Sequence, residues 1–158
     1  MGSHSQESNE RGSMIDFEKV LIALNVKGNE IATGLGIDVC FDGITLAGEI
    51  YEPEPQANYI NFVLVPNDVD RRGLANGEAE VMQAAIYQAT IHVGKDGKAN
   101  PNMEALKLSN SVRGGFSQGL KLVSGGQTCK VTRADRPVSV PNETHKAYAV
   151  GIYFDCIA

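Results

Sequence analysis

Two histidines beyond the first thirteen residues, His92 and His145, are the side chains best suited to proton transfer or metal binding near neutral pH. His92 falls on the polar side of an alternating stretch, and no other His or Cys stands at metal-ligand spacing beside it. His145 begins the last apolar stretch in a polar context, PNETHK. We therefore interpret both as solvated or interface histidines rather than as catalytic or metal-binding groups.

Three cysteines, Cys40, Cys129 and Cys156, are the next candidates for chemistry. They are odd in number, far apart in the sequence, and each lies in a strand-like context. We interpret them as small buried or half-buried thiols, and a disulfide or a metal site is the alternative.

The sequence contains neither a Cys-His signature nor a Ser-x-x-Lys box. Its glycine clusters at 34–36 and 125–126 do not extend to a phosphate-binding loop, so we interpret them as turns. Asp68 and Asp70 are spaced as in a calcium loop, yet arginines follow where further ligands should come. We expect a protein that is not an enzyme and that has no cofactor and no metal.

The chain has 158 residues and a formal net charge of −5. Mild acidity with scattered lysines and arginines argues against a protein that grips nucleic-acid phosphates. No apolar run approaches the roughly 18 residues of a membrane span, and no signal peptide follows Met14, which favours the cytoplasm. We expect residues 1–13 to be a disordered expression leader and residues 14–158 to be a single domain.

The elements that must position these residues are organised around residues 84–119, which predict a strand, a glycine-containing loop and a helix. Alternation places Gln88, Thr90 and His92 on the polar face of the strand, opposite an apolar face. The apolar face consists of Tyr87, Ala89, Ile91 and Val93. Asn100 is a suitable N-cap and Pro101 suits the first helical turn. The helix buries a stripe of Ala105, Leu108, Val112 and Phe116.

The N-terminal half predicts a helix over 17–32 capped by Asp16, then a strand over 37–41. Asp42 and Gly43 predict a hairpin into residues 44–46, or a loop with a bulge. An extended segment leads to an apolar strand from Tyr59, which we expect to be central or covered on both sides and to end at Pro66. Residues 67–80 then read as a long loop of functional interest.

The C-terminal part predicts two short strands around a turn at 124–126, a proline-containing connection, and a regular last strand over 146–157. Short connections dominate, and only the helical crossover is expected to join parallel strands. The sequence therefore predicts an α+β fold, a mostly antiparallel sheet with two helices packed on one face.

Three stretches together carry a resemblance to a known family. The first is NYINFVLVPND followed by RRGLANGEAEVMQAAIYQATIHV, and the second is a helix with Ala105, Val112, Arg113 and Phe116 at family-like spacing. The third is the closing CKVTRADRPVSVPNETHKAYAVGIYFDC. In their order and in their local residue patterns, these stretches resemble the tail terminator proteins of tailed bacteriophages. The departure is residues 42–56, which are longer than the family pattern suggests.

The resemblance implies a virion structural protein that forms a ring, usually a hexamer, on the last layer of the tail tube. Such a ring ends tube polymerisation and presents a head-tail joining surface to a head-completion or neck protein. DNA only passes through the lumen, and no membrane is involved. The implied location is the head-proximal end of the tail, after assembly in the host cytoplasm.

A ring needs head-to-tail contacts between copies. Our candidates for contacts with other copies or with the tube are Arg71 and Arg72 in the long loop, the polar face of Gln88, Thr90 and His92, and Lys95 in the loop 94–100. The two arginines can also be read as a solvated charge pair, although arginine is enriched at interfaces. Two other functions stay open: a neck component of similar fold, and a small-ligand-binding α+β domain with a deep apolar pocket.

Overall fold

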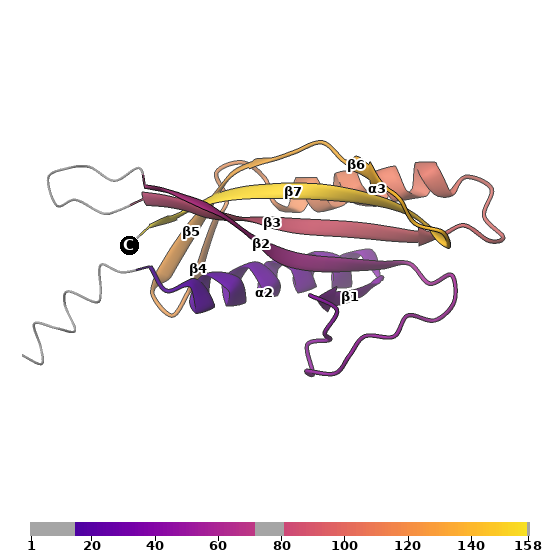
Figure 1. The fold of residues 1–158 in the computed structure, drawn as a ribbon, viewed down its shortest axis with the longest axis horizontal. Helices are drawn as coiled ribbons and strands as arrows, with labels where there is room; N and C mark the ends of the chain where they lie inside the picture. The colour runs from indigo at the N-terminus through magenta and orange to yellow at the C-terminus, as the bar shows by residue number, and fades with distance from the viewer. Residues whose placement is uncertain (1–14, 72–80, 158) are drawn as a thin grey trace, which may run out of the picture.

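Two helices and seven strands make up the part of the chain that the computed structural model describes, residues 15–71 and 81–157, with the backbone alone for 66–71 and 81–85 (Figure 1). The predicted leader therefore lies outside the described residues. In chain order the elements are α2 (Phe17–Leu35), β1 (Asp38–Phe41), β2 (Tyr59–Arg71), β3 (Val81–Gly94), α3 (Pro101–Gly115), β4 (Lys121–Ser124), β5 (Gln127–Ala134), β6 (Val138–Val140) and β7 (His145–Ile157).

The strands form one sheet in the order β1-β2-β3-β7-β5-β4, with β6 beside β7. Every neighbouring pair is antiparallel except β1 with β2, so the predicted α+β fold with a mostly antiparallel sheet is confirmed. The parallel pair is joined by residues 42–58 without a helix, which corrects our expectation that only the helical crossover could join parallel strands. The segment is long enough for such a crossover.

The core gathers around Phe62 of β2. Its ring stacks on Tyr87 with centroids 5.2 Å apart and lies 6.2 Å from Phe116, which follows α3. Gly28 of α2 lies against the same ring. Both helices therefore contribute to the core that covers β2 and β3, while the arrangement of both on one face of the sheet stays a prediction.

Both helix starts are confirmed at the atom level. The Asp16 carboxylate accepts a hydrogen bond from the Lys19 backbone N–H at 3.3 Å, and the Asn100 side chain accepts one from Met103 N–H at 3.0 Å. α2 is three residues longer than predicted and ends at Gly36, whose φ of 69° suits a left-handed cap.

β2 differs from its prediction at both its end and its outer face. The strand continues past Pro66 to Arg71, through a register shift between Pro66 and Asp70. Pro66 is still in register with Ala85, but β1 pairs with β2 only over Tyr59–Phe62, so within the described residues Pro66 lies on an edge stretch, where a strand tolerates a proline. The predicted loop over 67–80 is thus strand as far as Arg71, and residues 72–80 lie outside the described residues. β2 lies between β1 and β3, which confirms the predicted central position, while the alternative of a strand covered on both sides does not apply because Val65 is exposed.

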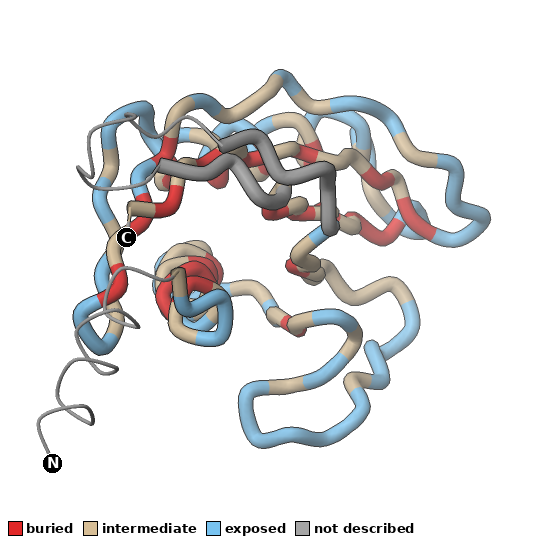
Figure 2. Tube along the Cα trace, turned by 60° about the vertical axis from the view of Figure 1, so that its left-hand side comes forward, coloured by how far each residue is buried: buried red, intermediate tan, exposed pale blue. Residues whose placement is uncertain are grey.

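The turn at Asp42 and Gly43 is confirmed, but the hairpin that it was expected to open is not. Both residues have positive φ, 52° and 76°, and Phe41 and Ile44 exchange backbone hydrogen bonds of 2.7 and 3.0 Å. Only isolated bridges follow, so residues 44–46 form no strand with β1. The chain instead makes an exposed excursion away from the buried core (Figure 2).

β6 was not predicted, since a three-residue strand between prolines carries too little alternation to be recognised. It pairs with residues 147–149 of β7. Within residues 15–71 and 81–157, neither helix is long and apolar enough to cross a bilayer.

Candidate functional site

Three of the six candidate contact residues share one face of β3, as alternation predicts. The register places Gln88 between Val63 and Gly151 and places Thr90 between Asn61 and Ala149. These neighbours are mostly small or polar, and the five side chains that are not glycine are all half-buried. The middle of this sheet face therefore offers a shallow polar surface rather than a cleft.

His92, the third of these residues, is part of an aromatic cluster at the end of the sheet. Its ring stacks on Tyr59 with centroids 4.2 Å apart, and the ring of His145 meets the edge of both. Burial lowers the pKa of His92, and the neighbouring His145 lowers that pKa further. His92 is thus half-buried, and the rings of Tyr59 and His145 pack against its imidazole. Only part of its surface is available to a partner.

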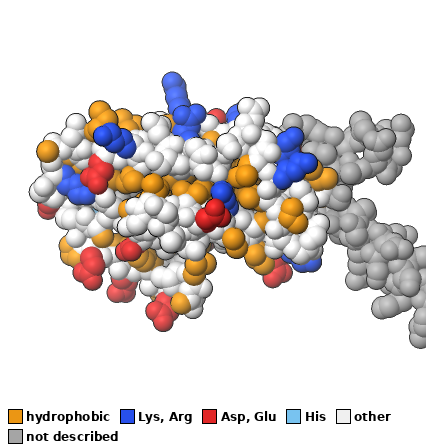
Figure 3. Space-filling view, turned by 180° about the vertical axis from the view of Figure 1, so that it is seen from behind, with side chains coloured by type: hydrophobic (Ala, Val, Ile, Leu, Met, Phe, Trp, Pro, Cys, Tyr) orange, Lys and Arg blue, Asp and Glu red, His pale blue; other side chains and the backbone are white. Residues whose placement is uncertain are grey.

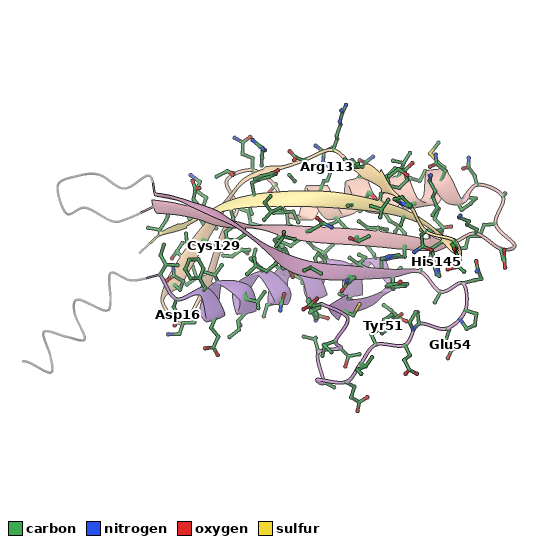
Figure 4. All side chains as sticks on the ribbon, in the orientation of Figure 1. Asp16, Tyr51, Glu54, Arg113, Cys129 and His145 are labelled. Atoms are coloured by element: carbon green, nitrogen blue, oxygen red, sulfur yellow. The ribbon has the colours of Figure 1, made fainter. Side chains whose placement is uncertain are left out.

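His145 is buried, so our interpretation of it as a solvated histidine is wrong. Its Nε2 lies 3.0 Å from the Ala57 carbonyl oxygen, and its Nδ1 lies 2.8 Å from the Thr144 hydroxyl. The ring thereby fastens the start of β7 to the segment that precedes β2. Figure 4 shows His145 at the end of the molecule where the loops come together.

Lys95 is exposed but is already held by its own chain. Its ammonium donates to the Asn142 carbonyl at 3.0 Å, and its backbone N–H donates to the Thr144 carbonyl at 3.3 Å. The next residue, Asp96, donates its backbone N–H to the Gln56 side chain at 2.8 Å. The loop after β3 is therefore tied to two other loops at this end.

Arg71 closes β2, with its backbone opposite Met82, while its side chain and all of Arg72 lie outside the described residues. β3 runs from Val81 beside Arg71 to Gly94 beside Lys95. At about 3.4 Å per residue, these two ends are roughly 40 Å apart. Arg71 and Lys95 thus lie near opposite ends of β3, with Gln88, Thr90 and His92 along the strand between them.

The cysteines are free and buried, which confirms their interpretation as thiols. Burial raises the pKa of Cys40 and Cys129 to about 11 and that of Cys156 to about 12. Such thiols are almost wholly protonated near neutral pH and are poor nucleophiles. Among the residues that the structure describes, no group of three His, Cys, Asp or Glu side chains is placed to hold a metal ion.

A feature that the sequence did not indicate is the segment 44–50, which we call the apolar turn. It presents Leu46 and Ile50 to solvent with exposed fractions of 63% and 76%. Backbone hydrogen bonds from Thr45 N–H to Glu49 O (2.8 Å) and from Gly48 N–H to Thr45 O (2.9 Å) close it. The apolar turn is thus an ordered structure that exposes apolar side chains.

Side-chain hydrogen bonds anchor the apolar turn to the sheet. Asn61 of β2 accepts a hydrogen bond from the Gly43 N–H at 3.0 Å. The Tyr51 hydroxyl donates to the Asp38 carboxylate of β1 at 2.9 Å, and burial is the main cause that raises the pKa of Tyr51. The apolar turn therefore has a fixed position relative to β1 and β2.

A second exposed apolar surface lies between α2 and the edge strand β4. We call it the α2–β4 groove, and its volume is about 150 Å³. It is lined by Ile22, Ala23, Val26, Lys27, Glu30, Leu122, Val123 and Ser124. Val26 and Val123 have exposed fractions of 61% and 63%. Lys27 and Glu30 pair with each other at 3.3 Å at its rim.

The two apolar surfaces differ in charge. Residues 42–54, which include the apolar turn, carry Asp42, Glu49, Glu52 and Glu54, all exposed, and no Lys or Arg. Figure 3 shows acidic side chains interspersed with apolar ones along the lower edge where this segment projects. Beside the groove, Lys121 of β4 stands directly opposite Lys130 of β5, and both are exposed.

An open cleft of about 490 Å³ lies between α3 and β5, lined by Asn110, Arg113, Gly114, Phe116, Ser117, Gln118, Arg133 and Ala134. Its lining is largely polar, unlike the deep apolar pocket expected of a small-ligand-binding domain. Arg113 donates to the Ala134 carbonyl at 3.1 Å. Arg133 lies over the Tyr153 ring and pairs with Asp135 at 3.2 Å. Arg133 therefore has partners within the chain, whereas the Nε of Arg113 is buried and has no hydrogen-bond partner among the described residues.

No protein-family model and no curated protein matches this chain. One solved structure, whose name indicates no function, has a similar fold. Its TM-score is 0.58 at 13% sequence identity, and the match covers 90% of this chain and 96% of the other. At that identity the similarity shows the fold alone.

Proposed function

We propose that this chain is a tail-terminator-like structural protein, which assembles with copies of itself into a ring at the end of a bacteriophage tail tube. The observation that carries the proposal is the presence of two ordered, exposed apolar surfaces at separate places on one chain, the apolar turn and the α2–β4 groove. Exposed apolar side chains that gather in a patch are typical of interaction sites.

Two different surfaces favour a heterologous contact between copies. A two-fold dimer needs one self-complementary patch, whereas head-to-tail contacts between unlike patches close into a ring or continue as a filament. The stretches that resemble tail terminators favour the ring. The α+β fold is compatible with this role but does not select it, since one fold serves many functions.

A neck component of similar fold is the nearest alternative, because it would use the same kind of self-association. It differs in its partner, the portal side instead of the tube. A ligand-binding domain is the alternative from another class, and the α3–β5 cleft is its best candidate pocket. We favour it less because the lining of that cleft is largely polar and Arg133 in it already has Asp135 and Tyr153 as partners.

The test is negative-stain imaging of the protein mixed with its candidate tail tube protein, with tube length and tube ends scored. We expect short tubes of uniform length that carry a ring at one end. Binding to the portal side with unaltered tubes would favour the neck component. Unaltered tubes with no bound density on either partner would contradict both phage roles.

A further inference from the structure

We infer that the apolar turn of one copy docks into the α2–β4 groove of the next copy. The inference rests on the proposed function only in one respect, that a series of these contacts closes into a ring. Leu46 or Ile50 is the inserted side chain, and Val26 and Val123 are the groove residues that receive it. The occupant of the groove is thus a second copy of this chain.

The sizes of the two surfaces agree. An apolar cavity of about 150 Å³ takes a group the size of benzene, and the groove has a volume of about 150 Å³. One branched aliphatic side chain such as Ile50 or Leu46 is of this order. Its insertion would cover Ile22, Val26 and Val123, which solvent reaches in the single chain.

The apolar turn is ordered before it binds. Its hydrogen bonds within residues 44–50, and those from Gly43 to Asn61 and from Tyr51 to Asp38, hold the exposed side chains in place. A surface fixed in this way loses little conformational entropy on docking.

Charge favours the same pairing. Glu49 and Glu52 flank Ile50 on an acidic segment, whereas Lys121 stands opposite Lys130 on the hairpin beside the groove. Asp155 of β7 stands opposite Lys130 on its other side, so these three side chains together leave one positive charge in excess. A carboxylate from a neighbouring copy would be attracted to that charge, and it would give the contact a direction.

The two surfaces do not meet within one copy. The side chains that line the groove come from α2 and β4 and include none from the apolar turn. Leu46 and Ile50 keep most of their surface exposed in the single chain. The contact therefore has to be made between copies, and because the surfaces are unlike it is head-to-tail.

The test is cross-linking between two variants at high protein concentration. One carries Leu46→Cys or Ile50→Cys, the other carries Val26→Cys or Val123→Cys, and they are mixed under a mild oxidant. A disulfide needs the two Cα atoms within about 7 Å, so it reports direct contact. The native cysteines are buried and serve as an internal background.

The matched control pairs the same turn variants with Val138→Cys, a similarly exposed valine on β6. We expect the turn–groove pairs to give at least about tenfold more cross-linked dimer than the control, because docking raises the effective concentration of the two thiols. If all four turn–groove pairs give no more cross-linked dimer than the control, the inference is overturned. This holds also if the wild type elutes as a monomer.

A second measurement separates this inference from the proposed function. The variant Leu46→Asp/Ile50→Asp and the control Val138→Asp are imaged with the tail tube protein. Cross-linking without any effect of the wild type on tubes would support the contact and contradict the terminator role. A different result would support the terminator role and overturn the contact. In that result the wild type and the variant Leu46→Asp/Ile50→Asp cap the tubes equally well, and the turn–groove cysteine pairs give no cross-link.

Discussion

Gly28 is the residue where local preference and packing disagree most clearly. A glycine in the interior of a helix destabilises it by roughly 1 kcal/mol relative to alanine, and on sequence grounds it weakens the second half of α2. In the structure, a Cβ atom built on Gly28 would lie 2.9 Å from the Phe62 ring. The ring cannot move aside, since it is buried between Tyr87 and Phe41. Glycine is therefore required by the approach of α2 to β2.

Replacement of Gly28 with alanine tests this. We expect Gly28→Ala to lower the free energy of unfolding by about 1–3 kcal/mol, because overpacking outweighs the gain in helix propensity. The matched variant is Gly34→Ala, on the same helix, where an added Cβ meets nothing within 4 Å. It should be neutral or stabilising by up to about 1 kcal/mol. Urea denaturation of both variants gives the comparison, and equal stabilities would contradict the packing argument.

The burial of His92 makes the free energy of unfolding decrease as the pH is lowered. Burial lowers its pKa in the folded chain below the ordinary value of 6.5. Above that value the imidazole is neutral in both states and its contribution to stability is full. As the pH falls from about 6.5 through the folded pKa, the unfolded chain binds more protons and stability is lost.

The expected result is a decrease in the free energy of unfolding as the pH is lowered from about 7 to about 5. The variant His92→Phe keeps an aromatic ring against Tyr59 and removes the titrating group, so its stability should change less over this range. Urea midpoints at several pH values provide the measurement. Identical pH profiles for the variant and the wild type would show that His92 is not responsible.

At the scale of the elements, the two faces of β2 have different roles. Ile60 and Phe62 are buried, while Val65 on the opposite face is exposed. Phe154 of β7 is likewise buried and belongs to the same core. The alternation of side chains thus decides which substitutions in a single strand affect the stability of the whole sheet.

Truncation of either buried ring should be strongly destabilising. We expect Phe62→Ala and Phe154→Ala each to lower the free energy of unfolding by roughly 3–5 kcal/mol, the usual range for a core phenylalanine. Val65→Ala, on the exposed face of β2, is the control and should change stability by no more than about 0.5 kcal/mol. A negligible effect at Phe62 would mean that the strand faces are inverted.

At the scale of the whole molecule, contacts with partners are expected at more than one place. The apolar turn and the α2–β4 groove are described surfaces, whereas the Arg71 side chain and Arg72 lie outside the described residues. The backbone of Arg71 lies near the end of β3 that is opposite to Lys95. A ring on a tube needs separate surfaces for neighbouring copies and for the tube, and this separation is compatible with it.

The double variant Arg71→Glu/Arg72→Glu tests whether the arginines serve assembly. We expect the melting temperature to stay nearly unchanged, as for most exposed charges, while the binding of the protein to tail tubes decreases. Thermal unfolding and tube imaging of the same preparation give both results. A large loss of melting temperature would instead assign the arginines a structural role.

Local signals in the sequence were enough for much of the fold. Asp16 and Asn100 predicted both helix starts, because an N-cap acts within one turn. Asp42 and Gly43 predicted their turn, because both adopt positive φ. Alternation along residues 84–93 placed Gln88, Thr90 and His92 on one face, because side chains alternate in any strand.

What the tertiary structure decided depends on residues that are distant in the sequence. His145 reads as a solvated histidine locally but is buried against Tyr59 and Ala57. Residues 44–46 read as the second strand of a hairpin or as part of a loop with a bulge, and Asn61 and Asp38 hold the segment 44–50 as an exposed apolar turn. The groove joins α2 to β4, elements about a hundred residues apart. Periodicity reports which face of an element is apolar, but only packing decides which apolar side chains stay uncovered and so are available to a partner.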